Sequence, residues 1–185
     1  MVVDNLTIKK IATLHPVIRD RVLQSYLYVN NKLLGKGIRL RFTYTYRTEV
    51  EQNSLYNIGR TKLFDKNGKK LGKVTNAKAW QSIHNYGLAF DIVLLYDKNN
   101  DGVFETASWD SVIDFDKDGK SDWMEVVDYF KSVGFEWGGD WKRFKDLPHF
   151  QMDFNMSWRD MKKKIDAGEY IKEQIEGKEY KYINI

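Results

Sequence analysis

The sequence predicts an α+β protein with a small, mainly antiparallel sheet and flanking helices. Helical and strand periodicities mix along the chain without regular βαβ alternation, which favours this class. Residues 16–34 place apolar side chains on one helical stripe that ends at Gly35, whereas residues 38–46 alternate between apolar and polar, as a half-buried strand does. The 185 residues are 42% hydrophobic and 15% aromatic, so we expect one globular domain spanning 1–185.

Local signals predict the remaining elements. Thr48 and Glu51 have the spacing of a capping box, which starts a helix running toward Gly59. We expect further strands at 91–96 and 149–154, further helices at 123–134 and 157–168, and a short strand in a charged tail that begins near residue 169. His84 falls in a glycine-containing loop, whereas Asp91 and His149 fall on or beside strands, so a site built from them would be held rigidly.

Composition limits the classes of function. The absence of cysteine excludes disulfides and thiolate metal sites. No apolar run approaches the length of about 20 residues that crosses a bilayer, so we expect no membrane insertion. No signal peptide is visible at the N-terminus, which predicts synthesis in the cytoplasm followed by release, or prior removal of a leader.

Charge is unevenly distributed. The net charge is +4 with an isoelectric point near 9.0. Residues 97–125 form an acidic insert of nine acidic side chains and three lysines, a balance of −6, so the remaining chain carries +10. A basic body favours a polyanionic partner such as nucleic acid, anionic lipid or an anionic cell wall. Nucleic acid is not expected, because no RRM or zinc-finger pattern is present. We expect a monomer.

Two segments, SIHNYGLAFD (82–91) and DLPHFQ (146–151), contain the candidate catalytic residues. His84, Asp91 and His149 could form a zinc site with three protein ligands and a fourth position for water. Asp146 would then be the base for that water. A lone histidine is as readily a hydrogen-bonded core residue, and the spacing alone leaves both interpretations open.

These segments, with TYRTEVEQNSLYNIGRT (45–61) and FEWGGDW (135–141), resemble the D-alanyl-D-alanine carboxypeptidase and L-alanyl-D-glutamate endopeptidase family of bacteria and phages, and most closely its endopeptidase branch. The resemblance spans roughly residues 14–154. It implies that His84, Asp91 and His149 bind zinc, that Asp146 is the general base and that Arg47 binds substrate or polarises the scissile carbonyl. The family often has Pro-Gly before the first histidine motif. Here Ala79-Trp80-Gln81 stands instead, which puts the shape of that loop in question.

The acidic insert contains a second type of motif. Residues 114–125 match the twelve-residue EF-hand calcium loop position by position, with Gly119 at the required turn. The expected ligands are Asp114, Asp116, Asp118, Lys120 through its carbonyl, Asp122 and Glu125. Residues 97–108 repeat the first half of the motif, and Asp97, Asn99 and Asp101 are candidate ligands of a second calcium. A hairpin turn would explain the same residues.

Taken together, the sequence predicts a zinc peptidase that cleaves peptidoglycan stem peptides at the cell wall, at L-Ala–D-Glu, with calcium as a stimulator. This would suit a phage endolysin or a bacterial wall-remodelling enzyme. The alternatives are a D-Ala–D-Ala carboxypeptidase and a wall-binding module that depends on calcium and has lost catalysis.

Overall fold

The computed structural model describes residues 2–185 and contains five α-helices, two short 3₁₀ helices, one π-helix and seven strands among them. The α-helices are α1 (Asn5–Ala12), α2 (Pro16–Tyr28), α3 (Glu49–Asn57), α4 (Asp122–Ser132) and α5 (Trp158–Asp166). The strands are β1 (Ile38–Tyr44), β2 (Ala89–Tyr96), β3 (Thr106–Ser108), β4 (Glu136–Trp137), β5 (His149–Gln151), β6 (Tyr170–Ile175) and β7 (Lys178–Ile183). The predicted α+β class is confirmed.

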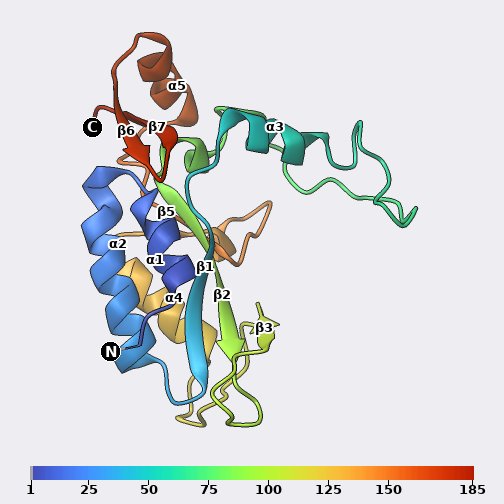
Figure 1. Cartoon of the computed structure of the whole chain (residues 1–185), viewed down its shortest axis with the longest axis vertical. Helices are drawn as coiled ribbons and strands as arrows, with labels where there is room; N and C mark the ends of the chain where they lie inside the picture. The colour runs from blue at the N-terminus through green and yellow to red at the C-terminus, as the bar shows by residue number, and fades with distance from the viewer. Residues whose placement is uncertain (1) are drawn as a thin grey trace.

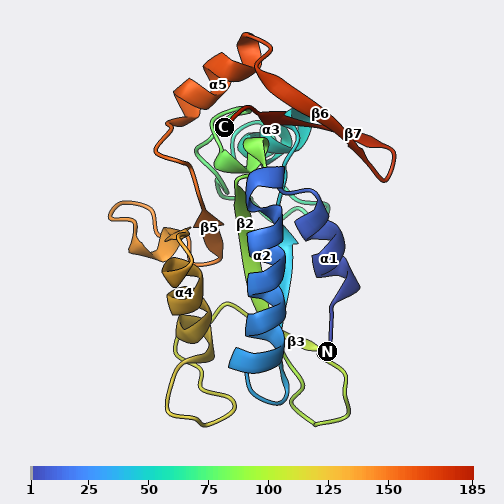
Figure 2. The ribbon, with the colours of Figure 1, turned by 90° about the vertical axis from the view of Figure 1, so that its left-hand side faces the viewer.

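The sheet is antiparallel throughout and has β2 at its centre. Its order is β1-β2-β5-β4, with β3 pairing the far end of β2, and β6 and β7 form a separate hairpin. Helices α1, α2 and α4 cover one face of the sheet (Figures 1 and 2). No helix within residues 2–185 is long and apolar enough to cross a membrane.

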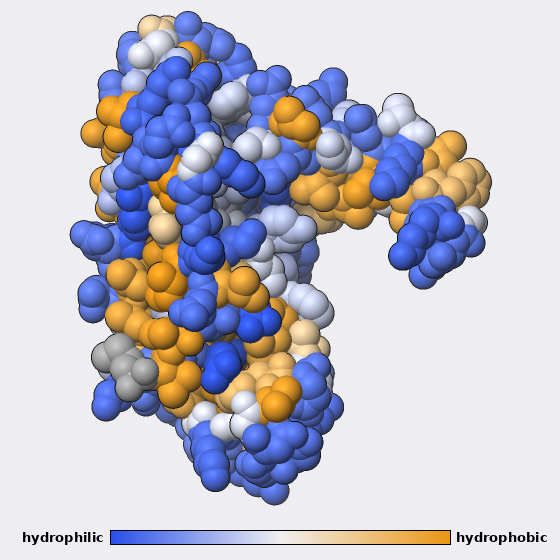
Figure 3. All heavy atoms as spheres, viewed as in Figure 1, coloured by the Kyte–Doolittle hydropathy of each residue, from blue (hydrophilic) through white to orange (hydrophobic). Residues whose placement is uncertain are grey.

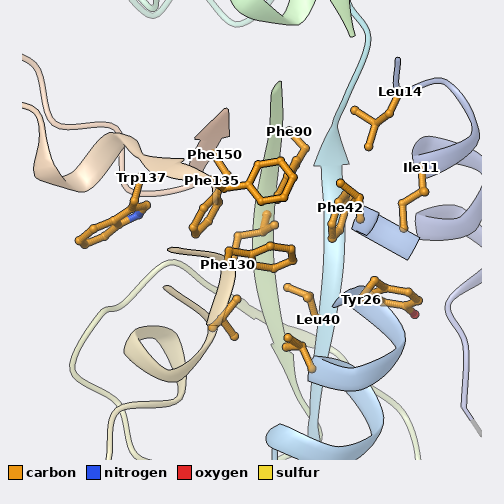
Figure 4. Close-up of a cluster of buried hydrophobic side chains, with 14 of the residues drawn as sticks. Ile11, Leu14, Tyr26, Leu40, Phe42, Phe90, Phe130, Phe135, Trp137 and Phe150 are labelled. Carbon is orange, nitrogen blue, oxygen red and sulfur yellow. The ribbon is translucent and has the colours of Figure 1, made fainter. Parts of the chain in front are cut away.

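The core lies between those helices and the sheet (Figure 4). Phe90 on β2 stacks against Phe42 on β1 and Phe150 on β5, and the ring centroids lie 4.7 and 5.4 Å away. Phe130 of α4 packs on the same ring from the helical side. Residues of alternating parity on a strand point to opposite faces, so Asp91, His149 and Gln151 lie on the face away from the helices. The tightly packed aromatic layer thus fixes the strands that carry the polar residues.

The helix predicted for residues 16–34 is confirmed. Its first part is α2, and its last part is a π-helical turn, Val29–Leu33. The strand prediction for 38–46 is wrong at its end. A register shift between Phe42 and Tyr44 is a β-bulge, which turns Tyr44 out of the core; its side chain is 48% exposed. The strand at 149 ends at Gln151, three residues earlier than predicted.

Two regions were described incompletely by the sequence patterns. Helix α1, whose hydrophobic stripe is short, was not predicted. The charged tail contains the full β6–β7 hairpin and packs against the body, because the Tyr182 hydroxyl donates to the Thr13 carbonyl and His15 Nε2 lies 2.8 Å from the Ile183 carbonyl oxygen. Glycine is required nearby, since Gly87 has φ +69° and a Cβ there would lie 2.8 Å from His15 N.

Candidate active site

His84, Asp91 and His149 converge on the open face of the sheet. His84 lies in a 3₁₀ helix, Ile83–Tyr86, rather than in the irregular loop expected, and Gly87 ends this helix in the left-handed conformation. Asp91 on β2 and His149 on β5 are directly paired across the two antiparallel strands. Sequence-distant residues therefore meet because strand pairing and one helical turn bring them to the same point.

The three donor atoms form a nearly equilateral triangle. His84 Nε2 lies 3.2 Å from Asp91 Oδ1 and 3.2 Å from His149 Nδ1, and the third side, His149 Nδ1 to Asp91 Oδ1, is 3.1 Å. Ligand atoms placed tetrahedrally about 2.0–2.1 Å from a zinc ion are separated by roughly 3.3 Å. The spacing of the donor set therefore fits a zinc ion.

Hydrogen bonds on the far side of each ring orient these histidines. His84 Nδ1 lies 2.7 Å from the Thr45 carbonyl oxygen, which can only accept, so Nδ1 carries the proton and Nε2 presents its lone pair. His149 Nε2 lies 3.0 Å from Gln151 Oε1, and the Gln151 amide nitrogen donates to Glu136 Oε2 at 3.1 Å. In the neutral rings, two nitrogen lone pairs and a carboxylate oxygen therefore face one another, an arrangement that suits a bound cation.

The charge states of the group agree with this geometry. Burial acts to raise the pKa of Asp91, but His84 and His149 outweigh it and hold that pKa well below its usual range. Burial lowers the pKa of His84. Burial also acts to lower the pKa of His149, but its hydrogen bond with Asp91 raises it overall. The lowered pKa of Asp91 and the raised pKa of His149 are what an ion pair between these two side chains produces.

Asp146 lines the same cleft, in the loop before β5. Burial, and next the negative charge of Asp91, raise the pKa of its carboxyl group. Its backbone N–H donates to the Gly138 carbonyl at 3.0 Å, and a Cβ on Gly138 would lie 2.4 Å from the Asp146 carbonyl oxygen and 3.1 Å from His149 Cβ. Glycine at 138 therefore allows the loop carrying Asp146 and His149 to approach the sheet.

Arg47 also lies in this cleft. Its Nη2 is 3.5 Å from Asp91 Oδ2, and its Nη1 donates to Gln52 Oε1 at 2.9 Å. Gln52 is fully buried and donates to the Ala77 carbonyl in turn. The Arg47 Nε–H is buried and finds no acceptor within residues 2–185. Thr48 and Glu51 form the expected capping box at the start of α3, directly after Arg47.

The two tryptophans of the WGGDW segment have different positions. Trp137 is buried, and its indole N–H donates to the Leu147 carbonyl at 2.6 Å. This hydrogen bond stabilises the loop that precedes β5. Trp141 lines the cleft with its ring centroid 5.1 Å from that of His149. The cleft has a volume of about 500 Å³ and opens between the 141–146 loop and the segment 74–77.

The loop that departs from the family pattern has an unusual backbone. Trp80 has φ +64°, a left-handed conformation that normally favours glycine. Its N–H donates to Asn85 Oδ1, its indole N–H donates to Glu49, and its ring packs 5.9 Å from that of Tyr86. The tryptophan thus adopts a turn that glycine would form without strain, held by side-chain contacts.

Four residues that support the site were not singled out from the sequence: Thr45, Gln52, Gln151 and Glu136. Their roles depend on hydrogen bonds to the candidate ligands and to Arg47, which no local pattern reveals. Gln151 alone had a usable signal, since it lies two residues after His149 on a predicted strand and so points to the same face.

The comparisons with known proteins agree with this geometry. The family model described as D-alanyl-D-alanine carboxypeptidase matches residues 75–152. The peptidoglycan L-alanyl-D-glutamate endopeptidase CwlK of Bacillus subtilis (strain 168) is 43% identical over 139 residues, 75% of this chain and 73% of that protein. The chain belongs to the D-alanyl-D-alanine carboxypeptidase family. It is a metallopeptidase, and the family is zinc-dependent. The predicted family is thereby confirmed.

A second relative is the L-alanyl-D-glutamate peptidase of Listeria phage A118, which is 30% identical over 121 residues. The match covers 65% of this chain and 32% of the phage protein, so the chain spans about a third of that relative. Both matches agree with the endopeptidase branch that the motifs resemble.

The acidic insert forms two loops at the opposite end of β2 from Asp91 (Figure 1). In the 114–125 loop, Asp114 accepts hydrogen bonds from the N–H groups of Asp118 and Gly119, at 3.2 and 3.0 Å. In the 97–108 loop, Asp97 accepts the equivalent bonds from Asp101 and Gly102, at 3.1 and 2.9 Å. The two loops thus have the same turn. Carboxylate oxygens gather in both, from Asp114, Asp116 and Asp122 in one and from Asp97, Asp101 and Glu105 in the other.

The other predicted loop ligands lie within the same turns. Asp118 Oδ1 accepts from the Lys120 N–H at 2.8 Å, and Asn99 Oδ1 accepts from the Asp101 N–H at 3.2 Å. Asp122 Oδ2 accepts from the Tyr96 hydroxyl and the Phe115 N–H. Asp122 Oδ1 and Glu125 Oε2 are buried and have no hydrogen-bond partner in the described chain.

Proposed function

We propose that this protein is a zinc-dependent peptidoglycan hydrolase that cleaves the L-alanyl–D-glutamate bond of stem peptides. His84, Asp91 and His149 would hold the metal. The observation that carries the proposal is the triangle of donor atoms, 3.1–3.2 Å apart, in a cleft that also contains Asp146 and Arg47. The names of the two relatives, an L-alanyl-D-glutamate endopeptidase and an L-alanyl-D-glutamate peptidase, support the choice of bond.

When bound, zinc supplies Lewis-acid activation of water and of the scissile carbonyl. Asp146 accepts a proton from the attacking water, whose oxygen forms the new bond to the carbonyl carbon. The same carboxyl group then returns that proton to the amine nitrogen as the C–N bond breaks. Its raised pKa favours the first step, because a carboxylate with a higher pKa is a stronger base toward the proton of water.

Arg47 would bind an anionic group of the substrate or stabilise the oxyanion that develops on the carbonyl. Gln52 Oε1 accepts from its guanidinium and holds it at the cleft. Trp141 and Phe144 line the mouth and would limit access of bulk water. These positions support binding of an extended peptide beside the metal.

The direct test is mass spectrometry of peptidoglycan digested by the zinc-loaded protein. New N-terminal D-glutamyl (or D-isoglutaminyl) peptides, with L-alanine left on the muramyl group, would support the proposal. Release of free D-alanine alone would show the carboxypeptidase alternative. Wall binding without any new terminus, in protein shown to contain zinc, would favour the wall-binding module.

Calcium binding in the 114–125 loop is a second candidate function. The two partnerless buried oxygens, Asp122 Oδ1 and Glu125 Oε2, favour it, because burying a carboxylate oxygen without a partner is costly. An ion held there would also offset the mutual repulsion of the loop's carboxylates. Since Asp122 bonds to Tyr96 at the end of β2, calcium would stabilise the strand that carries Asp91.

Binding of a second calcium ion by the 97–108 loop remains a prediction. Its turn matches that of the first loop, but Asp97 already accepts two backbone hydrogen bonds, and position 12 of the loop is Ser108. A calcium titration by calorimetry, with the stoichiometry as the readout, distinguishes one site from two.

A further inference from the structure

A projecting arm beside the cleft concentrates positive charge. The arm consists of residues 58–78, between α3 and the segment that leads to His84, and extends away from the body (Figure 1). It contains six lysines, one arginine and one aspartate, a balance of +6. The acidic insert carries −6, so the much longer remainder of the chain carries +4. The basic character expected of the whole body is therefore densest in one small element.

The arm forms a hairpin held by backbone hydrogen bonds and is not an irregular loop. Phe64 and Lys70 form an antiparallel bridge, the Leu71 N–H donates to the Leu63 carbonyl at 2.8 Å, and the Asp65 N–H donates to the Lys69 carbonyl at 3.0 Å. At the base, Gly59 has φ +72° and a Cβ there would lie 2.4 Å from the Gly72 carbonyl carbon. These contacts present the lysines at defined positions.

The cations of the arm have no anionic partner within the protein. None of its lysines, nor Arg60, forms an ion pair among residues 2–185. The single carboxylate, Asp65, accepts the N–H groups of Asn67 and Lys69 and so is used within the turn. A cluster of uncompensated like charges costs free energy of repulsion, which a bound polyanion would remove.

The base of the arm is also one wall of the cleft. Val74, Thr75, Asn76 and Ala77 line it opposite the loop that carries Trp141 and Asp146. A polymer whose side branch enters the cleft therefore contacts the base of the arm. Figure 3 shows the arm standing out from the body, with hydrophilic and hydrophobic surface exposed along it. Leu63 and Phe64 are large apolar side chains of the arm that are exposed to solvent.

We infer that the arm binds the peptidoglycan strand itself, through carboxylates of stem peptides next to the one in the cleft. The inference rests on the proposed function and assigns a second contact to the same substrate. Lys66, Lys69 and Lys70, at the tip, are the main contacts with these carboxylates. Lysine ammonium groups suit a partner of irregular spacing, because each is a flexible point charge and not a planar fork.

The test compares two triple variants. The arm variant is Lys66→Gln, Lys69→Gln and Lys70→Gln; the matched control is Lys32→Gln, Lys36→Gln and Lys98→Gln, three exposed lysines near the acidic end that form no ion pair in the described chain. Each metal-free protein is sedimented with purified cell walls, so that nothing is digested. The walls are first extracted with acid to remove phosphate-containing polymers.

We expect the arm variant to bind extracted walls about tenfold or more weakly than wild type at low salt, and the control to bind like wild type. The difference should shrink as salt screens the charges. With zinc, turnover of a soluble monomeric muropeptide should be equal for all three proteins, because it reaches the cleft without the neighbouring peptides. If the wild type cleaves no muropeptide, the proposed function fails, whereas the sedimentation result tests the arm by itself.

Three outcomes would overturn the inference. Equal binding by the arm variant and wild type to both extracted and unextracted walls would show that the arm makes no contact. A wild-type advantage that is present on unextracted walls and absent on extracted walls would assign the arm to phosphate polymers. Binding of the wild type to anionic lipid vesicles, lost in the arm variant while wall binding is unchanged, would assign it to a membrane surface.

Discussion

Asp91 and His149 face each other across β2 and β5, with Asp91 Oδ1 3.1 Å from His149 Nδ1. The antiparallel register makes this contact, so slipping either strand by one residue would send that strand's polar side chain to the helical face. Phe90 and Phe150, the adjacent residues, stack in the core and lock that register. The packing of the core therefore determines the geometry of the group formed by His84, Asp91 and His149.

Replacing His149 with alanine should remove zinc and abolish peptide hydrolysis while most of the fold remains. His15 is the matched control, because it is equally buried but structural: its Nδ1 accepts from the Val17 N–H at the start of α2. His15→Ala should cost about 1–2 kcal/mol of stability, as loss of a helix cap does, yet retain zinc. Metal analysis and thermal melts distinguish the two. Full activity in zinc-free His149→Ala protein would contradict the assignment, as would zinc loss in His15→Ala.

Asp146→Asn should retain zinc and lose about 10²–10⁴-fold in turnover, because the amide cannot accept the proton of water. The measurement is kcat on a soluble muropeptide together with zinc content. Loss of the metal from this variant would show instead that Asp146 is a ligand or supports one.

Arg47→Ala should also retain zinc, since the arginine contacts Asp91 Oδ2 and not the oxygen that faces the histidines. We expect the loss to fall on kcat/KM, because Arg47 would bind an anionic group of substrate and transition state. Gln52→Ala keeps the Arg47 guanidinium but removes the hydrogen bond that holds it, so it should lower kcat/KM less than Arg47→Ala does. Equal activity of Arg47→Ala and wild type would exclude the role.

Gln151→Leu should weaken zinc binding by about 10–100-fold, because His149 Nε2 loses the acceptor that fixes its proton and ring orientation. Glu136→Gln, one contact further out, should have less effect. Chelator competition measures the affinity, and the nitrogen chemical shifts of His149 in metal-free protein report its tautomer. Unchanged affinity and tautomer in Gln151→Leu would leave that glutamine without a positioning role.

Calcium should reverse a specific pH dependence of stability. Burial raises the pKa of Asp122, and burial followed by the charges of Asp118 and Asp116 raises that of Glu125. A raised folded-state pKa gives stability that is complete below the unfolded values of 3.8 and 4.5 and is lost as pH rises through the folded values. When a chelator keeps the protein free of calcium, the contribution of these two carboxyl groups to the free energy of unfolding should therefore decline as pH rises above about 4.

Saturating Ca²⁺ should remove that decline, raise the melting temperature near neutral pH and increase hydrolysis by zinc-loaded protein. Glu125→Gln should weaken the response without removing zinc, and Asp97→Asn should have the smaller effect. Melting curves over pH, with and without calcium, make the comparison. Superimposable curves for the wild type in the two conditions would exclude the loop as a calcium site.

The sequence by itself determined the class of fold and the family, and it singled out His84, Asp91 and His149, which the structure brings together. The strand alternation at 38–42, the capping box at Thr48 and the motifs around His84 and His149 are local signals. Each involves residues close together in the chain, so the sequence alone is enough to recognise it. The same holds for the acidic loops, whose turn depends on the spacing of a few carboxylates and a glycine.

Only the tertiary structure decided how these pieces meet. The bulge that turns Tyr44 outward, the bonds from Thr45 and Gln151 that orient the histidines, and the placement of the charged arm against the cleft all join residues far apart in the chain. Such contacts depend on strand register and on which faces pack together, and the free energy that selects them belongs to the whole core. No single segment encodes that free energy, so a local pattern cannot reveal its outcome.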